Sequence, residues 1–455
     1  MKAKKVLAAL LAVTVVMGLN GCSSGLQGAA DAEAPKQQDE RQTADAAQTE
    51  ESKKDDEEVT LTLSVDSDET LDGLQAVCDK AKEVLGITVE LDIYTAGTDG
   101  DNIMKTRLAS GDMADMCVWS DSKFKSVGPD KYFMDLSGTD IPDKLDDTYR
   151  EAVTYNGGVY GIPVGTSMCG AILYNRDLYE KYNLEVPKTW DEFLKNCQVI
   201  KDGGDTAVLG TFADSWTAQV LFLGDYYNVS AKDPDFYKNF EAGTAKYANT
   251  PAAMRSFQKF EDLKDYYNSD YMATIYDDGC EILAEGNAAH WIMLTQALSN
   301  IYSLYDKETV DKIGVFGIPD EDPDNQGITV WTPSTIFGNK NSDKTDDILR
   351  FMEFYISEQG LDAYCSAQMA DGPFLVKGYE SASDGYRAVE EDMQAYFDAG
   401  KTEVDMQSQV QVVGSDLPAI CVEVATGQID GKAAAEKYDA DCYKAAVQLN
   451  LDWKE

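Results

Sequence analysis

The stretch Asn156–Leu194 reads NGGVYGIPVGTSMCGAILYNRDLYEKYNLEVPKTWDEFL and carries signals for a turn, a strand and a helix in close succession. Asn156-Gly157 is a dipeptide preferred in tight hairpin turns. Residues 171–175 (AILYN) predict a strand. Thr189 predicts a helix N-cap, and Glu192 stands at the third helical position, as in a capping box. The stretch therefore indicates strands that alternate with helices, the order typical of an α/β fold.

The residues before this stretch predict a first α/β layer. β-branched residues alternate in 59–65 (VTLTLSV), and 87–94 (ITVELDIY) and 115–119 (DMCVW) are two further strand candidates. Helical spacing of apolar residues predicts a helix over 69–85 and a shorter one over 101–109. Strands and helices in this order indicate a parallel sheet.

The residues after the stretch continue the alternation, without an internal repeat. We expect strands around 288–293, 313–318 and 329–337, a helix over 344–357, and two C-terminal helices over 417–425 and 431–449. About 400 residues follow the N-terminal region, which suggests two domains.

The N-terminal region predicts export. Three lysines within residues 1–5 precede an uncharged apolar run over 6–17, and Cys22 follows Gly21. This pattern is typical of a secretory signal peptide. The cysteine resembles the lipobox of bacterial lipoproteins, which implies cleavage before Cys22 and acylation of its thiol. The alternatives are a plain secretory signal with an incidental cysteine, and a transmembrane anchor, for which the run is shorter than the ~20 residues required.

The segment after the cysteine predicts a tether. Residues 23–58 contain no aromatic residue and are rich in Ser, Gly, Ala, Gln, Asp and Glu. Such a composition cannot bury enough apolar surface to offset the entropy of ordering. We therefore expect a signal peptide over 1–21 and a disordered tether over 22–58. The folded body would sit on the outer face of the cytoplasmic membrane, which it touches only through the lipid.

Charge and composition narrow the possible functions. The formal net charge is -42, from 39 Lys and Arg against 81 Asp and Glu. Affinity for phosphates rests on Lys and Arg, so we expect no nucleic-acid partner. His290 is the single histidine, which excludes a zinc site with two or more histidines and allows a Ser-His-Asp triad only if His290 itself serves. We expect no cofactor, no metal and no catalytic residue.

Eight cysteines besides Cys22 are scattered without a CxxC pair. An exported chain could pair them as disulfides. We favour buried free thiols, because a body of this size does not need such cross-links. The eight are Cys78, Cys117, Cys169, Cys197, Cys280, Cys365, Cys421 and Cys442.

Several stretches together resemble the family 1 extracellular solute-binding proteins, the sugar-capturing subunits of ABC importers related to maltose-binding protein. Residues 156–194 carry a Gly-Ile-Pro element, a strand ending in Tyr-Asn and the phrase Pro-Lys-Thr-Trp-Asp-Glu-Phe. The other matching segments are 108–119 (LASGDMADMCVW), 283–293 (LAEGNAAHWIM), 313–319 (IGVFGIP), 350–364 (RFMEFYISEQGLDAY) and 428–438. The matches follow the family order across nearly all of 59–455. His290-Trp291 departs from the commoner Met-containing pattern.

The resemblance implies a two-lobed, periplasmic-binding-protein-like α/β fold with three inter-lobe crossings and a central ligand cleft. The crossings are expected near 164–170, 331–336 and 371–376. Lobe 1 is then expected over 59–165 and 336–371, and lobe 2 over 166–330 and 375–455. The lobes would close on the ligand by a hinge motion.

The resemblance also implies a function. The protein would be a monomeric, lipid-anchored receptor of an ABC importer, which captures a mono- or oligosaccharide and delivers it to the permease subunits without chemistry. Two other readings remain. The same fold could bind a non-sugar solute such as a polyamine, or the chain could be a surface glycoside hydrolase that uses two carboxylates. Product formation from an oligosaccharide would separate the hydrolase from the receptor.

Four tryptophans are candidates for stacking on a sugar ring, because sugar sites combine aromatic rings with convergent polar groups. Trp119 directly follows a strand, at the end where ligands bind in open α/β sheets. Trp216 precedes an apolar helix and is a cleft aromatic or a contact at the helix start. Trp291 occupies a position that faces the cleft in relatives. Trp331 lies in the second crossing, where packing and cleft contact are both plausible.

Five carboxylates are the polar candidates. Asp68 and Glu69 follow the first strand, where they bind ligand or cap the next helix, and Asp121 follows Trp119. The resemblance places Asp371 at the third crossing as a hydroxyl acceptor, and Asp416 in a loop where relatives contact ligand. Arginine is scarce and unclustered, so we expect a neutral ligand.

Overall fold

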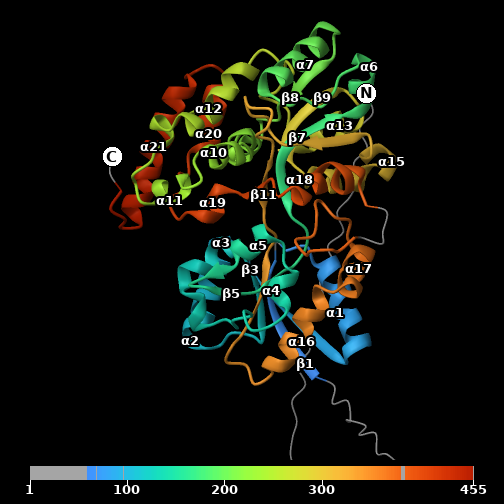
Figure 1. Ribbon diagram of the computed structural model, residues 1–455, viewed down its shortest axis with the longest axis vertical. Helices are drawn as coiled ribbons and strands as arrows, with labels where there is room; N and C mark the ends of the chain where they lie inside the picture. The colour runs from blue at the N-terminus through green and yellow to red at the C-terminus, as the bar shows by residue number, and fades with distance from the viewer. Residues whose placement is uncertain (1–58, 68, 96, 381–384, 454–455) are drawn as a thin grey trace, which may run out of the picture. The chain divides into compact units, whose positions relative to one another are not determined.

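The computed structural model describes residues 59–67, 69–95, 97–380 and 385–453. The expected signal peptide, the tether, Cys22 and Asp68 lie outside these residues. The described residues belong to one compact unit, which contains two large sheets, each with its own helices (Figure 1), and a small two-stranded sheet. Across the described segments, no helix has the length and apolar character that crossing a bilayer requires.

The first sheet has the strand order β2-β1-β3-β12-β6. Its strands are β1 (Val59–Asp66), β2 (Ile87–Tyr94), β3 (Met116–Trp119), β6 (Ile162–Pro163) and β12 (Thr335–Gly338). β1 pairs in parallel with β2 and with β3, and β12 runs antiparallel to both β3 and β6. The three parallel strands therefore end at one common edge of the sheet.

Helices α1 (Leu71–Leu85), α16 (Thr345–Tyr355) and α17 (Glu358–Ala367) pack with this sheet in one apolar core. Helix α1 buries Leu74, Val77 and Ala81 at helical spacing, as its sequence predicts. It ends at Gly86, whose φ of 70° places it in the left-handed region that favours glycine.

The second sheet has the order β13-β11-β7-β9-β8, and β10 pairs with the far end of β7. Its strands are β7 (Met168–Asn175), β8 (Thr206–Leu209), β9 (Ala288–Leu294), β10 (Ile313–Phe316), β11 (Ile328–Trp331) and β13 (Thr402–Val404). Helices of this lobe include α6 (Arg176–Tyr182), α7 (Trp190–Asp202), α12 (Pro251–Leu263), α20 (Leu417–Ala425) and α21 (Gly431–Gln448).

The remaining helices and short strands lie in the connections. They are α2 (Gly97–Ser110), α3 (Asp121–Phe124), α4 (Ile141–Lys144), α5 (Asp147–Ala152), β4 (Thr154–Tyr155), β5 (Gly158–Val159), α8 (Ser215–Ala218), α9 (Val220–Gly224), α10 (Tyr226–Lys232), α11 (Phe236–Glu241), α13 (Tyr276–Ala284), α14 (Ala297–Leu304), α15 (Lys307–Val310), a π-helical turn at Ala388–Met393, α18 (Gln394–Asp398) and α19 (Met406–Gln409).

Helix α7 begins where the sequence predicts. The Thr189 hydroxyl accepts a hydrogen bond from the Glu192 N–H at 3.2 Å. The Glu192 carboxylate accepts from the Lys188 N–H at 2.8 Å, one residue before the N-cap. The reciprocal bond of a capping box is therefore displaced by one position, and the helix start is still satisfied.

The chain passes between the sheets at 164–167, from β6 to β7, and at 332–334, from β11 to β12. The single strand expected over 329–337 is thus two strands in different sheets. Pro333 stands at the break, where it has no N–H to donate to a ladder.

A third segment, 371–376, pairs with the first passage. The Ser167 N–H donates to the Pro373 carbonyl at 3.0 Å. Leu375 and Val376 still pack in the core beside the first sheet. The expected start of the second lobe at 375 therefore falls inside the core of the first.

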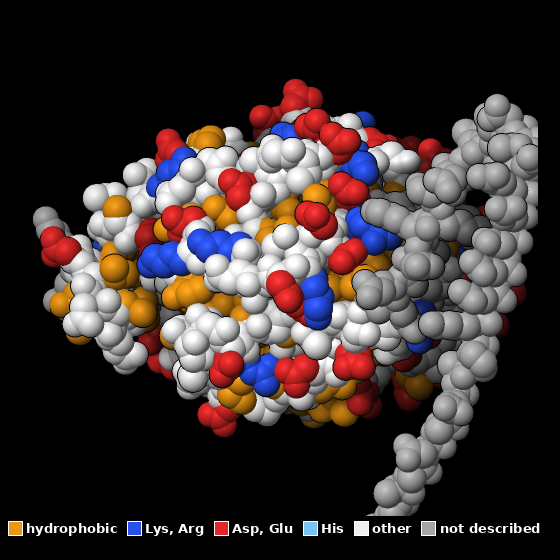
Figure 2. Space-filling view, turned by 90° about the horizontal axis from the view of Figure 1, so that it is seen from below, with side chains coloured by type: hydrophobic (Ala, Val, Ile, Leu, Met, Phe, Trp, Pro, Cys, Tyr) orange, Lys and Arg blue, Asp and Glu red, His pale blue; other side chains and the backbone are white. Residues whose placement is uncertain are grey.

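All eight described cysteines are free, and seven of them are buried, while Cys365 is half-buried. Burial raises the pKa of the seven buried thiols, for example that of Cys78 to about 12. On the face shown in Figure 2, acidic and basic side chains are interspersed with small apolar areas.

Candidate ligand-binding site

The carboxyl ends of both sheets point toward the connecting segments. In the first sheet β1, β2 and β3 are parallel. In the second sheet β8, β9, β11 and β13 all run opposite to β7, which starts at the connection. Ligands of open α/β sheets bind at the carboxyl ends of strands. The junction of the two sheets is therefore the place to look for a site.

Asp371 is the most unusual group at this junction. Its N–H donates to the Thr166 hydroxyl at 3.3 Å. Its Oδ1 atom is buried, and no partner for it is found among the described residues. Burial raises the pKa of this carboxyl to about 7, although hydrogen bonding from Ser299 on α14 acts in the opposite direction. A buried carboxyl with an open acceptor and a perturbed pKa is a functional-site candidate.

Glu69 is a second carboxylate near Tyr364 of α17. It follows β1, and burial raises its pKa, partly offset by a hydrogen bond from Ser334 in the second connection. Burial also raises the pKa of Tyr364, and the charges of Asp371 and Glu69 raise it further. A Cβ atom on Gly165 would come within 2.6 Å of the Tyr364 hydroxyl. The phenol thus lies against the first connection, near both carboxylates.

Trp216 supplies the aromatic ring of this group. It lies half-buried in α8, with its ring centroid 5.3 Å from that of Tyr276. The Asn300 amide donates to the Tyr276 hydroxyl at 2.8 Å. Asn300 and Ser299 are neighbours on α14, so one short helix after β9 links Trp216 to Asp371.

The structure places Trp291 differently from the expectation that it faces the cleft. Its side chain is 1% exposed and packs in a core of the second lobe. The ring lies 5.4 Å from Tyr276 and against Gly279 of α13, where a Cβ atom would come within 2.7 Å of it. Trp291 therefore supports the site from behind, through Tyr276.

For three other expected residues, no contact with the Asp371 group is found among the described residues. Trp119, expected to stack on a sugar ring, is 3% exposed and belongs to a core cluster with Phe124 and Phe337. Its indole N–H donates to Asp101 Oδ1 at 3.2 Å. Trp331 is half-buried at the end of β11, with its ring against Gly170. Asp121 begins α3, and its side chain is not among the described ones.

Among the described residues, no interaction joins Asp416 to the Asp371 group. It is exposed at the start of α20, and its N–H donates to Asp441 Oδ2 at 2.8 Å. Of the nine residues expected, Glu69 and Asp371 thus both lie near Tyr364, and Trp216 is linked to Asp371 through Tyr276 and α14.

Sequence reasoning missed the residues that connect these three. Ser299 and Asn300 stand just after the carboxyl end of β9, a position that could have indicated them. Tyr364 sits on the apolar face of α17, and nothing in its spacing distinguishes it from a core residue.

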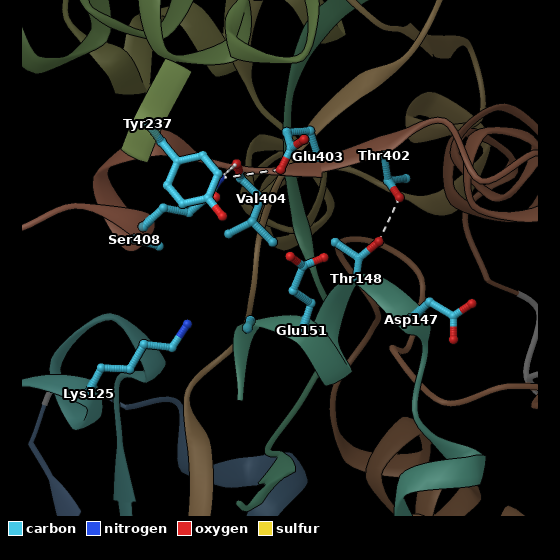
Figure 3. A pocket seen from close by; sticks show the side chains of 11 residues that line it. Lys125, Asp147, Thr148, Glu151, Tyr237, Thr402, Glu403, Val404 and Ser408 are labelled. Carbon is cyan, nitrogen blue, oxygen red and sulfur yellow. Dashed lines mark hydrogen bonds between the residues drawn. The ribbon is translucent and has the colours of Figure 1, made fainter. Parts of the chain in front are cut away.

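A separate cavity of about 220 Å³ opens between α5 of the first lobe and β13 of the second (Figure 3). Its lining is polar and includes Lys125, Thr148, Glu151, Tyr237 and Glu403. None of the nine expected ligand residues lines it. Within the described chain, no group of three or more His, Cys, Asp or Glu side chains is placed to hold a metal ion.

Comparison with known proteins agrees with this architecture. The sequence model of the bacterial extracellular solute-binding proteins matches residues 67–361. The chain belongs to this family, whose members are binding proteins rather than enzymes.

Three curated proteins that resemble this chain are all named as binding proteins. The multiple sugar-binding protein of Streptococcus mutans is 23% identical over 297 residues, 62% of this chain and 68% of that protein. The melibiose/raffinose/stachyose-binding protein MelE of Bacillus subtilis is 26% identical over 31% of this chain and 32% of its own length. An uncharacterized ABC transporter extracellular-binding protein of Pyrococcus horikoshii is 24% identical over 35% of this chain and 36% of its own. Two of these matches thus span about a third of the relative.

Solved structures show the same two-lobed fold over most of the chain. The apo form of RafE from Streptococcus pneumoniae aligns with a TM-score of 0.70 at 20% identity, covering 85% of this chain and 98% of that one. A chitin oligosaccharide binding protein aligns with a TM-score of 0.64 at 21% identity, covering 86% and 99%. At these identities the likeness establishes the fold.

Proposed function

We propose that this protein is the lipid-anchored extracellular receptor of an ABC importer, and that it captures a mono- or oligosaccharide between its lobes. The observation that carries the proposal is the group around α14, which links the Trp216 ring to the Asp371 carboxyl with its open acceptor. An aromatic ring stacks on the C–H face of a sugar, and a carboxylate accepts from its hydroxyls.

The charge around the site supports a neutral ligand. Neither Glu69 nor Asp371 has an ion pair within the described segments, and no Lys or Arg is a cause of either pKa shift. An anionic ligand would meet two carboxylates without a compensating cation, which is costly at a buried site. Asp121, Trp331, Asp68 and Asp416 are proposed as further contacts, and the buried Trp119 and Trp291 as supporting residues.

Names of the relatives support the choice of sugars. Several similar proteins are named for sugars, among them a RafE complex with raffinose and a sugar transporter complex with stachyose. On this proposal, ligand contacts to both lobes stabilise the closed form by their differential affinity. The closed form then docks on the permease as a monomer.

A thermal-shift screen of the full chain tests the ligand class. The panel is raffinose, stachyose, galactose and chitin oligosaccharides, with spermidine and amino acids beside them. A ligand that binds only the native state raises the melting temperature, by RT ln(1 + [L]/Kd) in free energy. We expect a shift with a sugar. A shift with spermidine alone would leave the fold assignment unchanged and would overturn the proposal that the ligand is a sugar.

Two tryptophan variants locate the site. Trp216→Ala is expected to abolish the sugar-induced shift while the protein stays folded, because its ring is half-buried. Trp291→Ala is expected to lower the stability of the ligand-free protein by about 3 to 5 kcal/mol, the usual cost of truncating a buried Trp. Tyr443→Ala, which removes a half-buried aromatic ring on α21, is the matched control. An unchanged sugar shift in Trp216→Ala would contradict this placement of the site.

The lipid anchor has its own test. Radiolabelled fatty acid should be incorporated into the wild-type chain in a lipoprotein-processing host and not into Cys22→Ala. Equal labelling of both would contradict the anchor, and labelling of neither would favour the plain secretory signal.

A further inference from the structure

The first connection, from β6 to β7, is fixed to a different lobe at each end. On the side of the first sheet, the Val164 carbonyl accepts from the Tyr355 hydroxyl of α16 at 2.5 Å. On the side of the second sheet, Cys169 exchanges two hydrogen bonds with Thr295, which follows β9, each at 3.0 Å. Rotation of the lobes therefore has to be taken up by the backbone of residues 165–168.

Ser167 shortens this mobile stretch, because it is bonded to a loop of the first lobe. The loop, residues 368–373, begins after α17 and ends before Leu375, which packs beside the first sheet. The N–H and the hydroxyl of Ser167 both donate to the Pro373 carbonyl, at 3.0 and 2.9 Å. Ser167 is fully buried, where the low polarity strengthens such bonds. Ser167 is thus held by the first lobe, two residues before Cys169 is held by the second.

The same loop carries Asp371, so we call it the Asp371 loop. The Asp371 N–H donates to the Thr166 hydroxyl at 3.3 Å. A Cβ atom on Gly372 would come within 2.0 Å of the Ser167 carbonyl oxygen, so the loop lies close against the first connection. The loop also reaches the second lobe, because Met369 packs against a core cluster of that lobe. Asp371 therefore stands beside the hinge, in contact with the segment that joins the lobes.

A position beside the hinge has a consequence for ligand binding. A rotation displaces each atom in proportion to its distance from the axis, so groups at a hinge move least when two lobes close. Groups far from the hinge reach a ligand only after closure. Asp371 can accept from a ligand hydroxyl in both the open and the closed form, as long as its loop stays attached to the first connection.

We propose that Ser167 is a positioning residue, which attaches the Asp371 loop to the hinge and so keeps Asp371 available to the ligand in both forms. In the described chain, three hydrogen bonds join the first connection to this loop, and Ser167 donates two of them. The binding role of Asp371 rests on the proposed function, whereas the attachment of the loop does not depend on any ligand.

Hydrogen exchange of the ligand-free full chain, resolved to single amides, tests the attachment. Ser167→Ala removes the hydroxyl and keeps the N–H. We expect the protection of amides 167 and 371 to fall by roughly threefold to tenfold, the scale of one neutral hydrogen bond. The amides of Val164 and Cys169 should keep their protection, because their acceptors lie outside the Asp371 loop.

Two companion variants separate the attachment from a general effect on folding. Thr166→Val keeps the shape of the side chain and removes the acceptor of the Asp371 N–H, so it should lower the protection of that amide. Ser64→Ala is the matched control, because Ser64 on β1 is 1% exposed and its hydroxyl donates to Asp92 within the first lobe. It should leave amides 167 and 371 unchanged.

A sugar that binds in the thermal-shift screen gives a second readout. Ser167→Ala should weaken its binding by roughly threefold to tenfold. The same change should weaken binding no further in the Asp371→Asn background, because the effect passes through the Asp371 carboxylate. A serine with a merely structural role would weaken binding equally in both backgrounds.

Two exchange results would overturn the attachment: unchanged protection of amides 167 and 371 in Ser167→Ala, or an equal loss of protection at amides 164 and 169. An equal loss of sugar affinity with and without the Asp371 carboxylate would overturn the positioning role. Failure of every sugar in the screen would overturn the proposed ligand class and leave the exchange result standing by itself.

Discussion

Replacing Asp371 by Asn should stabilise the ligand-free protein at neutral and alkaline pH. The pKa of this carboxyl rises from 3.8 to about 7 because it is buried. The two values differ by about three, and one pKa unit corresponds to ~1.4 kcal/mol, so ionising Asp371 in the folded state costs about 4 kcal/mol. Relaxation and water entry reduce such penalties, and we expect a gain of about 2 to 4 kcal/mol for the variant at pH 8.

The sign of the pH dependence follows from proton linkage. A carboxyl with a raised folded-state pKa binds its proton more tightly in the folded than in the unfolded chain. Its contribution to the free energy of unfolding is fully present below 3.8, the pKa in the unfolded chain, and is lost as the pH rises to about 7. The difference in unfolding free energy between Asp371→Asn and the wild type should therefore be small at pH 4.5 and should grow up to about pH 7.

Urea unfolding at a series of pH values measures this difference. Asp416→Asn, at an exposed aspartate, is the control and should give a constant difference near zero. In Asp371→Asn the affinity for a sugar should fall at least tenfold, because a hydrogen bond to a charged acceptor contributes about 1.5 to 3 kcal/mol. A variant that is no more stable than the wild type at pH 8, or that binds sugar equally well, would refute the reasoning about Asp371.

Two further predictions concern the frame around the site. A Cβ atom on Gly372 would lie 2.0 Å from the Ser167 carbonyl oxygen, so Gly372→Ala should cost about 1 to 3 kcal/mol of unfolding free energy. Gly138→Ala, with nothing within 4 Å, should change it by less than ~0.5 kcal/mol, and equal values for the two would contradict the close packing of the connections. Lys259 Nζ lies 2.5 Å from Asp225 Oδ1, and both side chains are 1% exposed. Lys259→Met should therefore cost about 3 to 5 kcal/mol by urea unfolding, and the double variant with Asp225→Asn should cost less; a larger loss in the double variant would argue against a stranded charge.

Local signals in the sequence were sufficient for most of the framework. The alternating β-branched run at 59–65 and the run at 87–94 became the first two parallel strands, in register from Val59 and Ile87. Thr189 and Glu192 fixed the start of α7, because side-chain caps act within one turn of the chain. The two-lobed fold followed from the order of motifs over most of the chain, and the family match agrees with it.

The site was harder to predict, because it depends on contacts between distant segments. From the sequence alone, Trp291 and Trp216 could each face the cleft or be buried in the core. The small residue Gly279, twelve positions before Trp291 and on another element, is what admits the Trp291 ring to the core. Likewise, the link from Asp371 through α14 to Tyr276 joins three segments that are distant along the chain. No local periodicity encodes such a link.

Hydrogen-bonding capacity at the junction also bears on the choice between a polyol and a polyamine. Asp371 Oδ1 and the Tyr386 hydroxyl are both buried, and no partner for either is found among the described residues. The charge of Asp371 contributes to the raised pKa of Tyr386, so the two groups are near each other and the phenol keeps its proton. One group is an acceptor and the other is chiefly a donor. A hydroxyl can donate to the first and accept from the second, whereas an ammonium group has three donors and no acceptor. An ammonium ion would neutralise Asp371 but leave the phenol proton without an acceptor, so this pair favours a hydroxyl-bearing ligand.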